Sequence, residues 1–150
     1  MDRKIVIIVD RDWIGVSDMR EIIFKAKRKD NGEWVEGCYV YCRKHHYILP
    51  VLNKAIGFDE REDEWIEIDP DTLCQCTGLT DKNGRKIWEN DIVKHKDSQC
   101  FGIIRWYCGD YVGWCVYDVY DDEQQFTMDM LNECEVIGNI FDNADLLEVE

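Results

Sequence analysis

Short runs in which apolar and polar residues alternate follow one another along most of the chain. Alternation with a period of two is typical of half-buried β-strands, because successive side chains in a strand point to opposite faces. Helical periodicity over any length is absent from most of the sequence. We therefore predict a mainly β protein of short antiparallel strands. The predicted strands are residues 21–28, 33–42, 47–52, 65–68, 72–80, 86–96, 101–107, 111–120 and 134–140.

Turn residues separate these runs. Asn-Gly pairs tolerate the positive φ angles that tight hairpins need, so turns are predicted at residues 30–32 and 81–84. In the second turn, Asp81 suits the first position of a type I turn and Gly84 suits the left-handed residue that commonly follows. Residues 43–46 are interpreted as a polar hairpin tip. Pro50 removes a backbone donor, so the strand that contains it is an edge strand or ends there.

The pattern changes toward the C-terminus. Residues 127–133 are predicted to form one helical turn or a loop, ahead of the last strand. Asp142 can accept hydrogen bonds from free backbone N–H groups, so we predict that it caps a short C-terminal helix that ends at Leu147. The charge run at residues 59–64 is predicted to be an exposed loop.

The first eighteen residues differ from the rest of the chain. They contain one strand-like run, residues 4–9, followed by polar and turn residues and then Met19. The codons AUA GGA GUG, which can encode residues 14–16, contain the ribosome-binding sequence AGGAG suitably upstream of Met19. We hypothesise that translation starts at Met19, so that residues 1–18 are an over-extended reading frame and residues 19–150 form the domain. The alternative is a genuine extra strand, and mass spectrometry of the natively expressed protein decides between them.

The charge balance narrows the possible partners. The chain is 45% hydrophobic and 12% aromatic, which is enough for an ordinary packed core. Its 32 acidic and 18 basic residues give a formal net charge of −14. Such a surface repels phosphate backbones, so nucleic acid is not an expected partner and basic partners are favoured. Residues 20–29 hold five bases and one acid, and we interpret them as a solvated strand face.

Eight cysteines raise the question of a disulfide framework. The sequence shows no secretory signal, because the first apolar run is short and charged residues follow it at once. Several cysteines lie inside apolar strand-like runs, where a thiol behaves as a small hydrophobic group. No apolar stretch is long enough to span a membrane. We expect reduced cysteines in a soluble cytoplasmic protein.

Residues 71–93 resemble the signature of the YopX family, which comprises phage and prophage proteins of Gram-positive and other bacteria. The segment reads DTLCQCTGLTDKNGRKIWENDIV and contains the second predicted turn. Three further segments fit the family in the same order along the chain. They are residues 19–24, 32–37 and 135–140. The resemblance therefore covers Met19 to Leu147, and its first segment supports Met19 as the initiator.

Three positions depart from the pattern of the family. Cys76 stands where an aromatic residue is common. Lys27 stands where Trp is common, so no role of that aromatic side chain carries over to this chain. Asn90 stands where Gly is common. Because Asn is the next best residue for a left-handed conformation, we expect the turn at Asn90 to survive.

The resemblance implies a mainly β fold that contains an SH3-like small barrel, and it implies no activity. The residues agree with a small barrel, because short strands at residues 91–94, 102–106 and 113–117 follow one another. Most residues of the signature are turn formers or apolar core residues. We therefore interpret the signature as fold-specifying, with Thr77, Gly78 and Asp91 serving geometry.

No motif in the chain amounts to a catalytic signature. Ligand types that zinc accepts are present, but their spacing is not that of paired Cys-x2-Cys knuckles. These residues are Cys38, Cys42, Cys74, Cys76, His45 and His46. His95 is interpreted as a solvated side chain, and turn acids such as Asp69 and Asp71 match no calcium loop. We predict no catalytic residue, no metal site and no cofactor.

The aromatic-rich segment of the predicted barrel, without a catalytic set, favours a non-catalytic binding module. Small barrels commonly bind through exposed aromatic side chains and loops. The candidate binding residues are therefore Trp88, Trp106, Tyr107, Tyr111 and Trp114. We expect the module to belong to a phage or prophage and to act in the host cytoplasm on an unknown host or phage protein. Unpaired strand edges and exposed aromatic side chains also favour a homo-oligomer.

Two alternatives from other classes stay open. A surface with a net charge of −14 can imitate the phosphate array of DNA and inhibit a host enzyme that binds nucleic acid. The cysteines and histidines also allow a metal-binding protein or an enzyme. The spacing of the exposed acids tests the first alternative, and elemental analysis of the purified protein tests the second.

Overall fold

The computed structural model describes residues 5–6, 22–50, 65–97, 101–109, 112–118, 125–126 and 128–148. Within these residues the strands pair in antiparallel fashion and the helices are short 3-10 turns, which confirms the prediction of a mainly β fold. The chain divides into two compact units, Met1–Gln75 and Cys76–Glu150, and each is described by itself.

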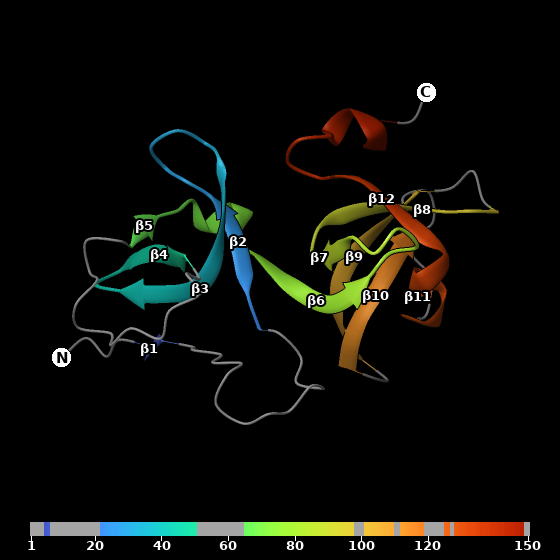
Figure 1. The fold of residues 1–150 in the computed structure, drawn as a ribbon, viewed down its shortest axis with the longest axis horizontal. Helices are drawn as coiled ribbons and strands as arrows, with labels where there is room; N and C mark the ends of the chain where they lie inside the picture. The colour runs from blue at the N-terminus through green and yellow to red at the C-terminus, as the bar shows by residue number, and fades with distance from the viewer. Residues whose placement is uncertain are drawn as a thin grey trace. The chain divides into compact units, whose positions relative to one another are not determined.

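The first unit is a sheet in the order β5-β4-β3-β2-β6, in which the long strand β3 pairs with β4 and β2 (Figure 1). Its core contains Ala26, Ile48 and Ile68, all fully buried. The elements are β1 (Ile5–Val6), β2 (Phe24–Lys27), β3 (Trp34–Cys42), β4 (His45–Pro50), β5 (Ile66–Glu67), the 3-10 helix η3 (Pro70–Thr72) and the start of β6 (Cys74–Thr80). Strand β1 pairs with β3, so the predicted run at residues 4–9 contains a strand. The position at which translation starts stays a prediction.

The hairpin between β3 and β4 turns more tightly than predicted. Arg43 and Lys44 both have positive φ angles, of 50° and 67°. A two-residue turn of this kind matches the twist of the flanking strands, so pairing resumes at once. His45 and His46, which were predicted at the hairpin tip, therefore belong to β4. Strand β4 is described as far as Pro50, beyond which residues 51–64 lie outside the described part of the chain.

The second unit contains the hairpin of β6 with β7 and a five-stranded sheet in the order β11-β10-β9-β8-β12. No pairing between described residues joins β11 to β12, so the SH3-like barrel stays a prediction. The elements are β7 (Lys86–Trp88), β8 (Asp91–His95), β9 (Phe101–Cys108), β10 (Val112–Asp118), β11 (Gln125–Phe126), the 3-10 helix η4 (Met128–Glu133), β12 (Cys134–Asn139) and the 3-10 helix η5 (Ala144–Leu147).

The C-terminal segment forms a single 3-10 turn, η5, where the sequence predicts a short helix. The residue before this turn is Asn143 and not the predicted cap Asp142. The Asn143 side chain instead accepts a hydrogen bond from the backbone N–H of Asn139 at 3.1 Å. It lies so close to Gly138 that a Cβ there would meet it at 2.3 Å, which explains the glycine.

Asp81, at the start of the signature turn, is a buried carboxylate that joins the turn to β12. Its Oδ1 accepts the N–H groups of Asn83 and Arg85, each at 2.9 Å, and its Oδ2 accepts that of Val136 at 3.0 Å. Burial by itself raises the pKa of Asp81, but these three backbone bonds outweigh it and hold the pKa below its ordinary value of 3.8. Gly84 donates to the Asp81 carbonyl at 3.0 Å and has a φ of 79°, which confirms the predicted turn.

The rest of the signature is also held by local hydrogen bonds. The Thr77 hydroxyl donates to the carbonyl of Ile87 at 2.7 Å, and the Asp91 carboxylate accepts the N–H of Trp88 at 2.8 Å. Asn90 has a φ of 68°, which confirms the prediction that asparagine supports a left-handed turn there. These contacts agree with the interpretation of the signature as fold-specifying.

Candidate functional site

The end of the β9–β10 hairpin exposes apolar side chains to water. Trp106 keeps 46% of its surface exposed and Val112 keeps 63%, and Cys108 is also exposed. In the register of the two strands, Trp106 stands opposite Trp114 and Cys108 opposite Val112. Directly paired residues share a face of a sheet, so all four side chains lie on one face. We call Trp106, Cys108 and Val112 the hairpin patch.

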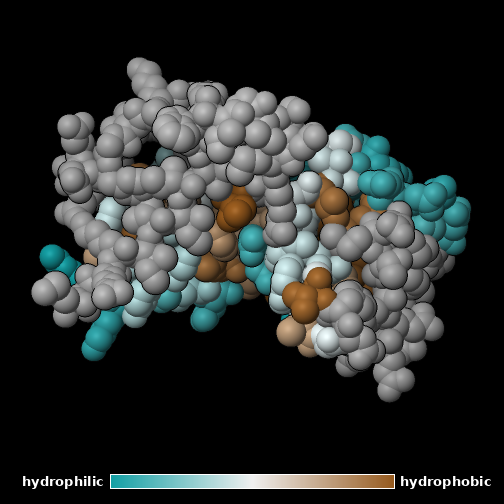
Figure 2. Space-filling model, turned by 90° about the horizontal axis from the view of Figure 1, so that it is seen from below, coloured by the Kyte–Doolittle hydropathy of each residue, from teal (hydrophilic) through white to brown (hydrophobic). Residues whose placement is uncertain are grey.

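The hairpin patch continues the core face of the sheet. The next pair along the same face, Ile104 with Val116, belongs to the buried core together with Trp114. The face therefore passes from a packed core to water within two cross-strand pairs. Figure 2 shows surface-exposed apolar groups (brown) beside hydrophilic ones on one side of the molecule. Exposed apolar groups that extend a core face in this way are typical of interaction sites.

Trp114 lies beside Trp106 on the same face of the hairpin. The two rings meet edge to face, with centroids 5.0 Å apart and planes at 78°. Trp114 is 4% exposed, and its buried indole N–H has no hydrogen-bond acceptor in the described part of the chain. Leaving a buried donor unpaired costs about 1–3 kcal/mol. Native proteins contain few such groups, so this one marks the hairpin patch as a candidate site.

Two other predicted binding residues, Trp88 and Tyr107, lie outside the hairpin patch. Trp88 is buried, which leaves it no surface for a partner. Tyr107 is half-buried on the opposite face of the hairpin, and its ring folds back over Gly109, where an added Cβ would lie 2.2 Å from the phenol oxygen. Tyr111 lies outside the described residues. Of the five predicted residues, the structure therefore brings together Trp106 and Trp114.

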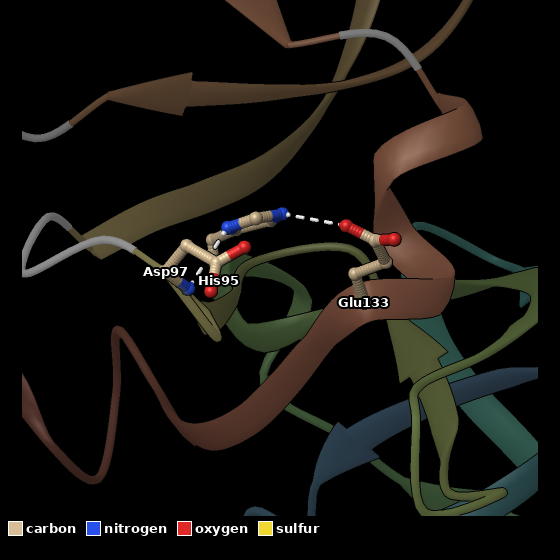
Figure 3. A group of neighbouring side chains, drawn as sticks. All are labelled: His95, Asp97 and Glu133. Atoms are coloured by element: carbon tan, nitrogen blue, oxygen red, sulfur yellow. Dashed lines mark hydrogen bonds and ion pairs between the residues drawn. The ribbon is translucent and has the colours of Figure 1, made fainter.

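A second cluster joins the end of β8 to the end of η4 (Figure 3). His95, Asp97 and Glu133 place one potential ligand atom each within 4.8 Å of one another. The Nδ1 atom of His95 accepts the backbone N–H of Asp97 at 3.2 Å, and its Nε2 lies 3.1 Å from Glu133. The Lys96 ammonium lies 3.3 Å from the other carboxylate oxygen of Glu133. The hydrogen bond from Lys96 lowers the pKa of Glu133, and that from His95 adds to the effect.

These contacts satisfy the cluster without a metal ion. Because His95 Nδ1 accepts a backbone N–H, the ring proton belongs on Nε2, where it is donated to Glu133. A cation at Nε2 would move that proton to Nδ1, where it would face the N–H of Asp97. It would also compete with Lys96 for the carboxylate. We therefore interpret His95, Lys96 and Glu133 as a polar latch that ties η4 to β8.

The cysteines and histidines considered as zinc ligands are not gathered. Among the described residues, His95, Asp97 and Glu133 are the only group of three or more ligand side chains close enough to hold a metal. Cys38 stands opposite Leu49, while His45 is bound to Glu67. Most of the described cysteines are buried, as expected of thiols that pack as small hydrophobic groups.

The model of the YopX family, described as YopX protein, matches residues 23–148. The chain belongs to the YopX family. A comparison with curated proteins finds no match. In the described residues, no helix has the length and apolar character needed to cross a membrane.

Two surface features of this YopX family member, the polar latch and the hairpin patch, were not predicted from its sequence. The polar latch depends on the register between β8 and β12, which places His95 opposite Cys134, next to Glu133. No local pattern carries that register. Cys108 lies in the connection between the predicted strands 101–107 and 111–120, and Val112 lies at the start of the second of these strands. Their apolar character so close to a turn was the available signal.

Proposed function

We propose that this YopX family member is a non-catalytic binding module and that the hairpin patch docks another protein. The observation that carries the proposal is the continuation of the core face into water at Trp106 and Val112. The buried N–H of Trp114, beside Trp106, supports it, since no described residue accepts it. In this account the buried aromatic residues Trp88 and Trp114 hold the fold, and Trp106 makes the contact.

The exposed part of Trp106 is large enough to anchor a partner. A tryptophan side chain buries up to about 250 Å², so covering the exposed 46% removes roughly 100 Å² from water. At about 25 cal/mol per Å², that is about 2.5 kcal/mol. Binding energy at protein interfaces is concentrated in a few such residues, and tryptophan is the most enriched type.

The family assignment suggests where the module acts. We propose that it is a phage or prophage protein that works in the host cytoplasm on a host or phage protein. A second copy of the chain is a less favoured occupant, since two surfaces of charge −14 repel each other.

Mimicry of nucleic acid is less well supported. An imitation of a phosphate array needs exposed acids that are free of basic neighbours. Several described acids instead form ion pairs or are buried. The pairs are Arg28–Asp30, Lys29–Glu67, Lys82–Glu135 and Lys96–Glu133, and the buried acids are Asp81 and Asp91.

Photo-crosslinking in a bacterial host tests the proposal. The full chain carries p-benzoylphenylalanine in place of Val112, which lies in the hairpin patch, or in place of Tyr41 as the control. Tyr41 is 41% exposed in the first unit. We expect an ultraviolet-dependent adduct with another protein from the Val112 position and none from the Tyr41 position. Equal adducts at both positions, or none at either, would contradict the proposal.

A further inference from the structure

We infer that the occupant of the hairpin patch is a basic protein segment in which arginine or lysine alternates with aliphatic residues. This inference rests on the proposed function and adds the chemistry of the partner to it. Three observations point to it: the negative charge of the second unit, the exposed part of the Trp106 ring and the buried N–H of Trp114, which no described residue accepts.

The second unit is strongly acidic. Residues 76–150 contain sixteen of the 32 acids but only six of the 18 bases. Two of those six bases, Lys82 and Lys96, are paired with Glu135 and Glu133. The field around this unit therefore attracts cationic segments and repels acidic ones. The same field argues against nucleic acid or an anionic membrane as the occupant.

Trp106 offers a ring to a cation. Tryptophan is the best aromatic partner for an ammonium or guanidinium group within about 6 Å of its ring. The chain uses this contact elsewhere, since Lys25 and Lys27 lie 4.7 Å and 5.5 Å from the ring centroid of Trp34. Among the described residues no lysine or arginine lies over Trp106. A cationic side chain of a partner can take this position.

The neighbours of Trp106 favour a bound segment that offers an aliphatic side chain and a backbone carbonyl. Val112 and Cys108 beside it need an aliphatic side chain to cover them. Trp114 has a buried N–H without an acceptor among the described residues, and a backbone carbonyl of the bound segment can supply one when the Trp106 ring turns aside. A segment with a cationic side chain next to an aliphatic one on an extended backbone can contact the Trp106 ring, cover Val112 and Cys108, and accept the N–H of Trp114.

Titration with defined peptides tests the inference. The probe is an acetylated and amidated peptide of eight residues that alternates arginine with leucine, and a matched peptide has glutamate in place of arginine. Each is labelled and titrated with the full chain, followed by fluorescence anisotropy. The variants are Trp106→Ser in the hairpin patch and Tyr41→Ser as an equally exposed control. The variant Trp114→Phe removes the indole N–H together with part of the buried ring, so its free energy of unfolding is measured alongside its binding.

We expect the unsubstituted chain to bind the arginine peptide and not the glutamate peptide. Trp106→Ser is expected to weaken binding at least about thirty-fold, the loss typical of an interface hot spot. Trp114→Phe is expected to weaken it about three- to tenfold, and Tyr41→Ser to leave it unchanged. Equal binding by Trp106→Ser would show only diffuse attraction between charges and would overturn the inference.

The two proposals fail separately. A crosslinked partner at Val112 whose contacting segment is acidic or neutral overturns the basic segment and leaves the docking surface standing. The absence of any crosslinked protein at Val112 overturns both.

Discussion

Two regions of the second unit show opposite arrangements. At the signature turn, the polar groups of Asp81 are buried and each carboxylate oxygen has a backbone partner. At the hairpin patch, apolar side chains are exposed and the N–H of Trp114 has no acceptor in the described part of the chain. The polar groups of the first region are hydrogen-bonded within the chain. The second region exposes apolar side chains that a binding partner could cover.

The signature turn identifies the family, whereas the hairpin patch is the surface that we propose for a partner. The signature is the strongest pattern in the sequence, and its contacts close a turn onto β12. The hairpin patch has no recognisable motif, which agrees with the proposed docking role, because a docking surface is fitted to its partner and not to the chain's own backbone. A strong motif in a chain of this kind therefore points to the fold, and a weakly patterned exposed surface is the place to look for function.

The largest expected effect is at Asp81. In Asp81→Asn, an amide N–H group faces either the N–H of Val136 or those of Asn83 and Arg85, so at least one buried donor loses its partner. We expect the free energy of unfolding to fall by about 3 kcal/mol. Urea unfolding followed by near-ultraviolet circular dichroism measures it.

Asp145→Asn is the matched control for this substitution. Asp145 is exposed in η5 of the same unit, so its substitution should change the free energy of unfolding by less than about 0.5 kcal/mol. Similar losses in both variants would remove the contrast between the signature and the surface.

Acid is expected to weaken the signature turn. The folded pKa of Asp81 lies below the ordinary 3.8. A group with a lowered folded pKa contributes stability above its unfolded pKa, and that contribution is lost as the pH falls through the folded value. Urea midpoints measured between about pH 5 and pH 3 should therefore fall more steeply in the unsubstituted chain than in Asp81→Asn. Parallel slopes would show that the Asp81 carboxylate is not the group that titrates.

Substitutions at residues with a left-handed backbone conformation should change the free energy of unfolding less. Gly84 and Asn90 are both left-handed, with φ angles of 79° and 68°. Gly84→Ala should cost about 1 kcal/mol because alanine resists this conformation, although open space surrounds the position. Asn90→Gly should leave stability within about 0.5 kcal/mol, since glycine adopts the same angle freely. Thermal unfolding of the pair checks both, and an Asn90→Gly loss as large as that of Gly84→Ala would contradict this explanation.

The polar latch should contribute least. Glu133 is exposed, and exposed ion pairs contribute little, so His95→Gln and Glu133→Gln should each shift stability by less than about 1 kcal/mol. Zinc added to the unsubstituted chain should leave its melting temperature unchanged. A stabilisation by stoichiometric zinc that Glu133→Gln abolishes would show instead that the cluster is a metal site.

The sequence predicted the local features of the fold well and the distant ones poorly. The Asp81 turn, the strand β12 and the left-handed Asn90 follow from residue types at short range. The tip of the β3–β4 hairpin was predicted too long. Arg43 and Lys44 adopt positive φ angles, which are uncommon for arginine and lysine and so could not be predicted from residue type. The predicted barrel needs pairings between distant strands, which no local pattern reports.

The candidate site was predicted in part, for the same physical reason. Trp106 and Trp114 look alike in the sequence, yet one is half exposed and the other buried. Alternation along β9 and β10 puts them on one face, but only the rest of the packed core decides where burial stops. The same holds for His95 and Glu133, which are far apart in the chain and meet through the register of β8 with β12.

The most direct test of the account measures partner contact and stability on one variant. The chain that carries p-benzoylphenylalanine at Val112 is compared with the same chain carrying Trp106→Ser as well. We expect the protein adduct to disappear while the variant stays folded, although its free energy of unfolding falls, since the buried half of the Trp106 ring and its edge contact with Trp114 are lost. An adduct that persists, or one that is lost only because the variant is unfolded under the crosslinking conditions, would contradict the assignment of Trp106 to binding.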